Sequence, residues 1–164
     1  SKQVVNSLEE YPGLFMMTVH TVGGKDMLEA AVSAAGQQAR KSKVKKPLIV
    51  GVTVLTSEEK EDNIPRLVLE RAALAKQAGL DGVVVSSQEA ALIRREFGKD
   101  FVIVTPGIRP RGSAAGDQKR VTTPFAAIAN GSNFLVVGRP IIAARDPLAA
   151  TKEILREIAA APDP

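Results

Sequence analysis

Two arginines that follow glycines at the ends of apolar runs are the residues of this chain best suited to chemistry. Arg109 stands two positions after Gly107 in TPGIRP, and Arg139 directly follows Gly138 in VVGRP. A guanidinium offers a planar fork of N–H donors to a phosphate, and a glycine lets backbone N–H groups approach it closely. The two motifs together predict a site that grips a phosphate-bearing ligand.

A structural interpretation of the same motifs remains open. Both arginines would then be solvated turn residues, and both glycines would only end strands. One motif alone fits this interpretation as well as it fits an anion site. Two motifs in successive strand-and-loop units favour the anion site, because the loops after the last two strands of a (β/α)8 barrel are a recurrent phosphate site.

The composition predicts one small domain over residues 1–164, with a core built mainly from aliphatic side chains. The chain has one Tyr, five Phe and no Trp to contribute aromatic packing. The absence of cysteine excludes disulfides and thiolate metal sites, and a single histidine leaves little for a zinc or iron centre. We therefore expect a site without metal.

The pattern of charge and hydropathy indicates where in the cell the protein is expected and whether it binds membranes or nucleic acids. No apolar stretch approaches membrane-spanning length, and no basic segment followed by an apolar one opens the chain. The basic cluster over residues 40–46 has no neighbouring aromatic side chain, and a helix end explains it better than a nucleic-acid surface. We expect a soluble cytoplasmic protein that binds neither membrane nor nucleic acid.

Short valine- and isoleucine-rich runs alternate with amphipathic segments along the chain. The runs are uniformly apolar, which is typical of buried parallel strands rather than of a half-exposed sheet. Strands are expected at Leu14–Val19, Leu48–Leu55, Gly82–Val85, Phe101–Val104 and Asn133–Val137. Helices are expected at Lys2–Glu10, Asp26–Arg40, Ile64–Ala78, Gln88–Phe97, Pro124–Asn130 and Pro147–Ala160.

Capping residues support several of these boundaries. Ser86 precedes a predicted helix and has Glu89 three positions on, as in a capping box. Thr123 and Asp146 each precede a proline suited to a first helical turn. The fold class is therefore α/β, with five β/α units after an opening helix. Part of a (β/α)8 barrel and an open doubly wound sheet both fit this order, and in both a ligand would sit at the carboxyl ends of the strands.

Several motifs of the chain resemble one family, the bacterial type of orotidine 5′-phosphate decarboxylase. The similarity spans nearly the whole chain, and its most specific part is Pro106–Pro110 with Gly112–Arg120, followed at the family's spacing by Gly138–Ile141. The segments that carry it are Val19–His20 with Gly23–Lys25, Gly51–Ser57, Gly79–Val84 with Ser86, Pro106–Pro110 with Gly112–Arg120, and Gly138–Ile141.

The resemblance implies a (β/α)8 TIM barrel, of which this chain covers about the last five β/α units. It implies a carboxy-lyase that converts orotidine 5′-phosphate to UMP and CO2 in de novo pyrimidine biosynthesis, without cofactor or metal. It also implies a homodimer.

The resemblance assigns five substrate-binding residues. Arg139 and Gly138 match the phosphate-holding positions at the end of the family's final strand, and Arg109 lies in the same phosphate-gripping region. Gln118 matches the loop glutamine that bridges phosphate and pyrimidine. Thr56 matches the first hydroxyl of a leucine-threonine-serine turn that contacts the pyrimidine.

The family's decarboxylating motif, aspartate-x-lysine-x-x-aspartate at the end of the third strand, has no counterpart in this sequence. Asp117-Gln118-Lys119 spells half of it, but within a stretch that already matches another motif. We therefore expect no catalytic residue in this chain, and no activity from these residues alone. The segment Glu58–Asn63 is also shorter than the family's usual connection.

Two alternatives to this function remain. One is a non-catalytic, phosphate-binding partial barrel, which the missing lysine and aspartates favour. The other is a related phosphosugar decarboxylase or synthase of the same suprafamily. Gln118 argues against the second, because those enzymes lack the long glutamine-bearing loop.

Overall fold

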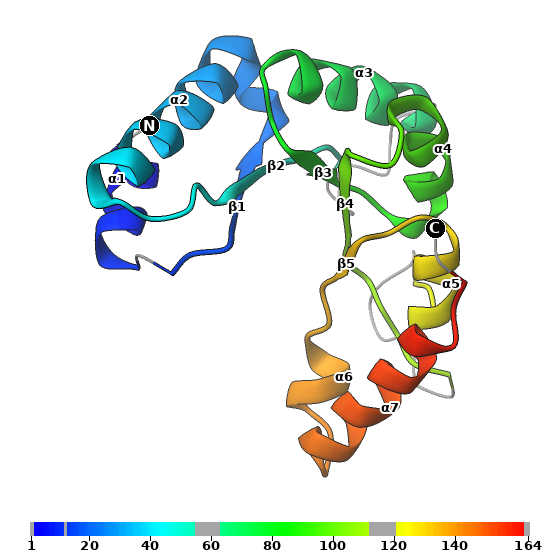
Figure 1. The fold of residues 1–164 in the computed structure, drawn as a ribbon. Helices are drawn as coiled ribbons and strands as arrows, with labels where there is room; N and C mark the ends of the chain where they lie inside the picture. Colours follow the sequence, from blue (N-terminus) through cyan, green and yellow to red (C-terminus); the bar gives the residue numbers. More distant parts are fainter. Residues whose placement is uncertain (1, 12, 55–62, 112–120, 163–164) are drawn as a thin grey trace. The chain divides into compact units, whose positions relative to one another are not determined.

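The computed structural model describes residues 2–11, 13–54, 63–111 and 121–162, which form two compact units (Figure 1). The described residues of the first unit are 2–11, 13–54 and 63–84, and those of the second are 85–111 and 121–162. Each unit is described by itself.

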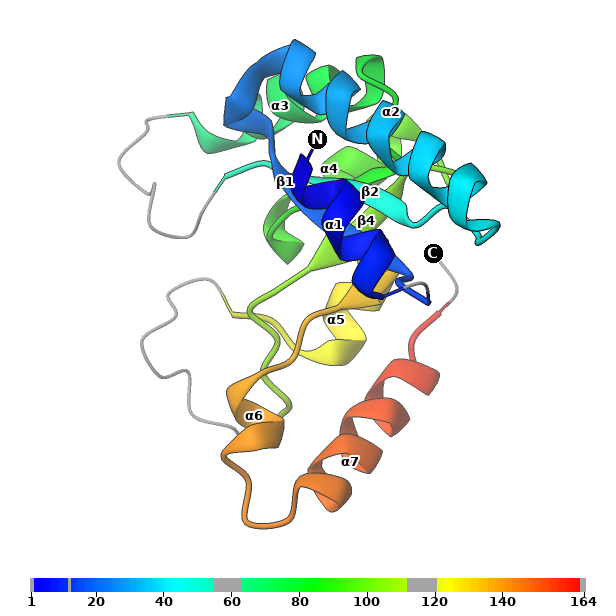
Figure 2. The ribbon, with the colours of Figure 1, turned by 90° about the vertical axis from the view of Figure 1, so that its left-hand side faces the viewer.

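The first unit is a parallel three-stranded sheet with helices between its strands. Its elements are α1 (Lys2–Glu10), β1 (Met16–His20), η1 (Thr21–Gly23), α2 (Gly24–Ser42), β2 (Leu48–Val52), α3 (Ile64–Gln77) and β3 (Gly82–Val84). The strands lie in chain order, and the carboxyl ends of β1, β2 and β3 are aligned through the pairs His20–Val52 and Val52–Val84. Figure 2 shows α2 and α3 side by side over β1 and β2.

The second unit continues the alternation of strand and helix. Its elements are α4 (Ser87–Phe97), β4 (Val102–Thr105), α5 (Pro124–Ala129), β5 (Phe134–Leu135), α6 (Arg139–Ile142) and α7 (Pro147–Ala159). β4 and β5 are parallel, with Thr105 opposite Leu135. The predicted order of five strands and six longer helices is confirmed. The short helices η1 and α6 were not predicted.

The core of each unit is aliphatic, as the composition predicts. In the first unit, alanines and leucines of α2 and α3 cover the apolar strand β2, where Ile49 and Val50 are fully buried. Gly51 stands where the packing is closest. A Cβ there would lie 2.8 Å from Thr21 Cγ2 and 3.0 Å from Leu80 Cδ2. The absence of a side chain at Gly51 therefore lets Thr21 of η1 and Leu80, two residues before β3, pack directly on β2.

The helix starts confirm the predicted caps. Thr123 Oγ1 accepts a hydrogen bond from Ala126 N at 3.1 Å, and Asp146 Oδ1 accepts one from Ala149 N at 2.9 Å. Ser86 Oγ accepts from Gln88 N at 3.3 Å. These side chains satisfy N–H groups that a first turn leaves without partners, and each marks the residue at which its helix begins.

Uniform burial of the strands was expected, and for β1 and β5 this is wrong. Thr18 and His20 of β1 are exposed, and so is Phe134 of β5. Among the described residues, β1 pairs only with β2, and the described pairing of β5 is with β4. Their side chains therefore have neighbouring strands on one side. β2 and β4 are buried as expected.

Candidate functional site

The chain turns sharply where β4 ends, and this turn carries the first predicted motif. Thr105 is the last residue of β4, and its carbonyl accepts a hydrogen bond from Val136 N at 2.9 Å, which extends the pairing with β5. Gly107 then adopts φ 78°, in the left-handed region that side-chain-bearing residues rarely occupy. The glycine of this motif is therefore required by the backbone itself, and it directs the chain towards Arg109.

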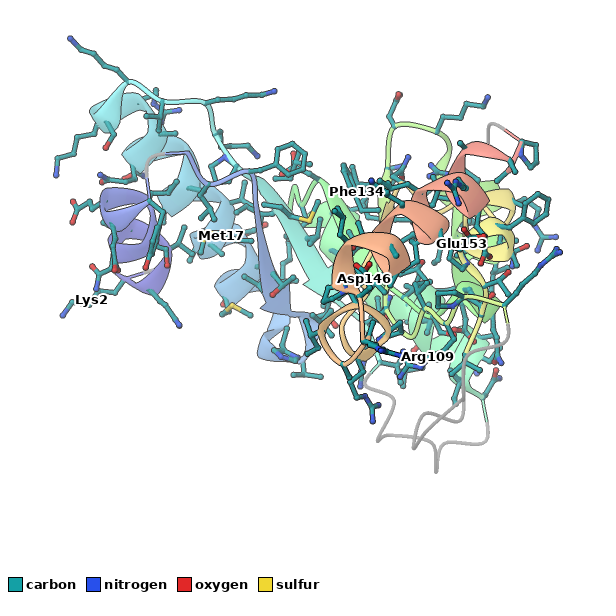
Figure 3. All side chains as sticks on the ribbon, turned by 90° about the horizontal axis from the view of Figure 1, so that it is seen from below. Lys2, Met17, Arg109, Phe134, Asp146 and Glu153 are labelled. Carbon is teal, nitrogen blue, oxygen red and sulfur yellow. The ribbon has the colours of Figure 1, made fainter. Side chains whose placement is uncertain are left out.

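Arg109 is a buried cation with most of its hydrogen-bonding capacity unused. Its side chain is 9% exposed, and Nη1 donates to the carbonyl of Ile108 at 2.8 Å. No ion pair to Arg109 exists among the described residues, and its other guanidinium N–H groups have no protein acceptor there. Figure 3 labels this side chain in the second unit. Because a guanidinium has five N–H donors, the site retains donors that suit an anion.

The backbone around Arg109 is held by the strand segment on the far side of the polar stretch. Arg109 N donates to Thr122 O at 2.8 Å, and Thr122 N donates to Gly107 O at 3.3 Å. Ile108 and Thr122 form a parallel β-bridge. These contacts fix the two ends of the intervening residues and hold the Arg109 backbone in place.

The second motif follows β5 in a corresponding way. Gly138 is the N-cap of α6, and Arg139 is the first residue of that helix, both exposed. Among the described residues, no heavy atom other than those of its chain neighbours lies within 4 Å of the position that a Cβ on Gly138 would take. The space beside Gly138 is therefore open to a ligand.

The structure brings three of the five predicted residues to one end of the β4–β5 pair. Arg109 stands four positions after the last residue of β4, and Arg139 four after the last residue of β5. Because the two strands are parallel, their carboxyl ends lie at the same edge. Thr56 and Gln118 lie outside the described residues.

The threonines that follow the strands of the first unit were missed by the sequence reasoning. Thr21, just after β1, donates its hydroxyl to Val52 O at 2.9 Å, and Thr53, just after β2, donates to Val84 O at 2.9 Å. Both side chains are buried. Each hydroxyl therefore ties one strand end to the next strand, and a threonine directly after an apolar run was the available signal.

A half-buried arginine, Arg94, has a structural role that the sequence did not reveal. Arg94 of α4 donates to the carbonyls of Gly98, Phe101 and Gly131, at 2.7, 3.0 and 2.6–3.2 Å, and to Asn133 Oδ1 at 2.7 Å. Desolvation lowers the pKa of this guanidinium from its usual value. Arg94 has thus used its donors on protein acceptors at the amino ends of β4 and β5, whereas Arg109 has not.

Groups of metal-ligating side chains and membrane-spanning helices are both absent from the part of the chain that the structure describes. Within these residues, no three His, Cys, Asp or Glu side chains gather in a way that could hold a metal ion. No described helix is long and apolar enough to cross a lipid bilayer.

Comparisons with known proteins give a consistent result. A profile of the orotidine 5′-phosphate decarboxylase / HUMPS family matches residues 3–154. The orotidine 5′-phosphate decarboxylase of Coxiella burnetii (strain RSA 493 / Nine Mile phase I) is 48% identical over 154 residues, which cover 89% of this chain and 64% of that protein. The enzyme of Moorella thermoacetica is 49% identical over 155 residues, covering 89% of this chain and 62% of that protein.

The solved structures agree in fold. The crystal structure of orotidine 5′-phosphate decarboxylase from Lactobacillus acidophilus matches with a TM-score of 0.77 and 34% identity, covering 97% of this chain and 70% of that chain. The enzyme from Pyrococcus horikoshii matches with a TM-score of 0.70 at 21% identity, a likeness of fold alone. The five β/α units are thus part of a TIM barrel. The chain spans just under two thirds of the length of the curated relatives cited above.

Proposed function

We propose that this chain, which belongs to the orotidine 5′-phosphate decarboxylase / HUMPS family, supplies the phosphate- and pyrimidine-binding part of an orotidine 5′-phosphate decarboxylase. The observation that carries this proposal is the buried guanidinium of Arg109, which has donors to spare at the carboxyl end of β4. The Gly138–Arg139 motif at the corresponding end of β5 adds a second guanidinium and open space for a ligand.

In the proposed site the substrate is held mainly through its phosphate group. Arg109 and Arg139 would each offer N–H donors to phosphate oxygens, and the absence of a side chain at Gly138 allows the phosphate to approach the backbone. Such contacts lie away from the reacting pyrimidine. Their binding energy can therefore be used to order the site and exclude water around the reacting bond.

The two residues outside the described part of the chain complete the proposed binding set. Gln118 would bridge the phosphate and the pyrimidine, and the Thr56 hydroxyl would contact the pyrimidine. Both assignments rest on the family motifs in which these residues stand.

The proposed reaction breaks the bond between pyrimidine C6 and the carboxylate of orotidine 5′-phosphate. Carbon dioxide leaves, and C6 takes up a proton to give UMP, in the de novo synthesis of pyrimidines. No metal or cofactor is part of this proposal. The five residues named above bind the substrate, and none of them is proposed to deliver the proton.

We further propose a cytoplasmic homodimer. The support is the family to which the chain belongs, as set out above. Sedimentation velocity over a range of protein concentrations tests the dimer. A single species at the monomer mass of 17.4 kDa at every concentration would exclude it for this chain.

Calorimetry with three ligands tests the binding function. UMP should bind, ribose 5-phosphate should bind more weakly, and uridine should bind weakest, because only the first carries both groups that the site recognises. An assay of CO2 release from orotidine 5′-phosphate then separates an enzyme from a binder. Binding without turnover would support the phosphate-binding partial barrel, and tighter binding of ribose 5-phosphate than of UMP would support a phosphosugar enzyme.

A further inference from the structure

A carboxylate of α7 reaches the backbone just beyond Arg109. Glu157 Oε1 accepts a hydrogen bond from the N–H of Arg111 at 3.2 Å. Its other oxygen, Oε2, is buried and has no hydrogen-bond partner among the described residues. Glu157 stands three positions after Ile154, the residue that α7 buries, so the two side chains share a face of the helix.

This placement is unfavourable for a carboxylate unless it has a role. Glu157 as a whole is half-buried, but its Oε2 is buried without a partner among the described residues, and burying a charged oxygen in this way carries a desolvation penalty. Among the described residues, the hydrogen bond from Arg111 N is the favourable contact that offsets this penalty for the Glu157 carboxylate. It joins two segments that are 46 positions apart in the chain.

The contact between Glu157 and Arg111 helps to hold the backbone next to Arg109. The backbone of Arg109 is fixed on its amino side by the bridge between Ile108 and Thr122. Two positions on, Glu157 fixes the backbone of Arg111. Arg109 therefore stands between two anchors. Removing the second anchor would leave the arginine held from one side only.

We propose that Glu157 is a positioning residue for Arg109, which holds the backbone at Arg111 against α7 so that the guanidinium stays aimed at a bound phosphate. The inference rests on the proposed function and deepens it. Glu157 acts through the backbone and does not touch the ligand, because a carboxylate in contact with a phosphate would repel it. Its acceptor oxygen is what the role requires, so a glutamine can replace it.

The test compares Glu157→Ala with Glu157→Gln in the complete chain. The alanine variant should bind UMP about tenfold more weakly, the loss typical of one hydrogen bond to a charged group, whereas its affinity for uridine should not change. The glutamine variant should bind UMP within about threefold of the parent, because it keeps an acceptor. Glu153→Ala is the matched control, since Glu153 lies on the same helix, is exposed and pairs with Arg156.

Amide hydrogen exchange supplies a readout that does not depend on ligand. The Arg111 N–H should exchange about tenfold faster in Glu157→Ala than in the parent, and near the parent rate in Glu157→Gln. Equal exchange in all three proteins would overturn the proposal. Equal losses of UMP and uridine affinity in Glu157→Ala would also overturn it, because they would show a general structural role. If the parent binds no UMP, the proposed function fails, and amide exchange alone then decides whether Glu157 anchors Arg111.

Discussion

Two arginines of the second unit, the half-buried Arg94 and the buried Arg109, show how the same side chain serves opposite purposes. Arg94 uses its guanidinium N–H groups on backbone carbonyls and on Asn133, and so ties loops to the amino ends of β4 and β5. Arg109 uses one N–H on Ile108 O and keeps the others available. The number of donors already satisfied therefore distinguishes the candidate ligand-binding residue from the structural one.

Replacing Arg139 by alanine should remove one of the two guanidinium groups proposed to hold the phosphate. We expect a loss of about 3 kcal/mol or more of transition-state stabilisation in a catalytically competent protein, and a comparable loss in the free energy of UMP binding. Steady-state kinetics with orotidine 5′-phosphate, or calorimetry with UMP, measures it. Arg145→Ala is the control, since Arg145 is exposed and outside the proposed set. An unchanged affinity in Arg139→Ala would contradict the assignment.

Thr53→Val should destabilise the first unit without altering its shape. Valine matches threonine in size but cannot donate to Val84 O, so that carbonyl loses the side-chain bond at the end of β3. We expect the free energy of unfolding to fall by about 1–2 kcal/mol, measured by urea denaturation followed by circular dichroism. Thr18→Val serves as a control because Thr18 is an exposed residue of β1. A similar fall in the free energy of unfolding of both variants would show that the hydrogen bond of the Thr53 hydroxyl does not stabilise the unit.

At the scale of the elements, helix starts marked by a capping residue could be predicted from the sequence. The short helix α6 and the exposure of the strands β1 and β5 could not. Thr123 and Asp146 cap their helices as the sequence indicates, and α5 and α7 begin where expected. The four-residue helix α6 is shorter than two turns and has no apolar periodicity to reveal it. The exposure of β1 and β5 depends on how many strands flank them, which no local pattern records.

The same distinction holds for the candidate site. The positions of Arg109, Gly138 and Arg139 beyond β4 and β5 were predictable because glycine and arginine after an apolar run are a local pattern, and their contact with a ligand stays a prediction. Glu157 was not, since its partner lies 46 positions away and only the fold brings the two together. Its helical spacing from Ile154 was the one clue available in the sequence.

Arg94→Lys should loosen the connection between α4 and the strands that follow it. A lysine ammonium is compact and cannot reach the Gly98, Phe101 and Gly131 carbonyls together with Asn133. We expect the free energy of unfolding to fall by about 2–4 kcal/mol, measured in urea. The neighbouring exposed Arg95, replaced by lysine, is the control and should change stability by less than about 0.5 kcal/mol. Equal stability of the two variants would refute this role of Arg94.

At the scale of the whole molecule, the net charge of +4 favours an anionic ligand over a neutral one. Screening shortens the reach of this field from about 30 Å at about 0.01 M salt to about 10 Å at about 0.1 M. UMP affinity should therefore weaken by about threefold to tenfold over this range, and uridine affinity should stay constant. Calorimetry at several salt concentrations measures how the affinities for UMP and for uridine change with ionic strength. A salt response that is the same for both ligands would show that the phosphate gains nothing from the positive charge of the protein.

The bridge between Ile108 and Thr122 has a consequence for how this part of the protein can evolve. It joins the chain on either side of residues 112–120, so the frame that carries Arg109 is closed independently of what stands between. Insertions, deletions or exchanges within that stretch leave the bridged backbone of Arg109 in place, so in the proposed site the contacts of Gln118 can change while those of Arg109 are inherited. The bridge and the residues between its ends can thus diverge separately under selection.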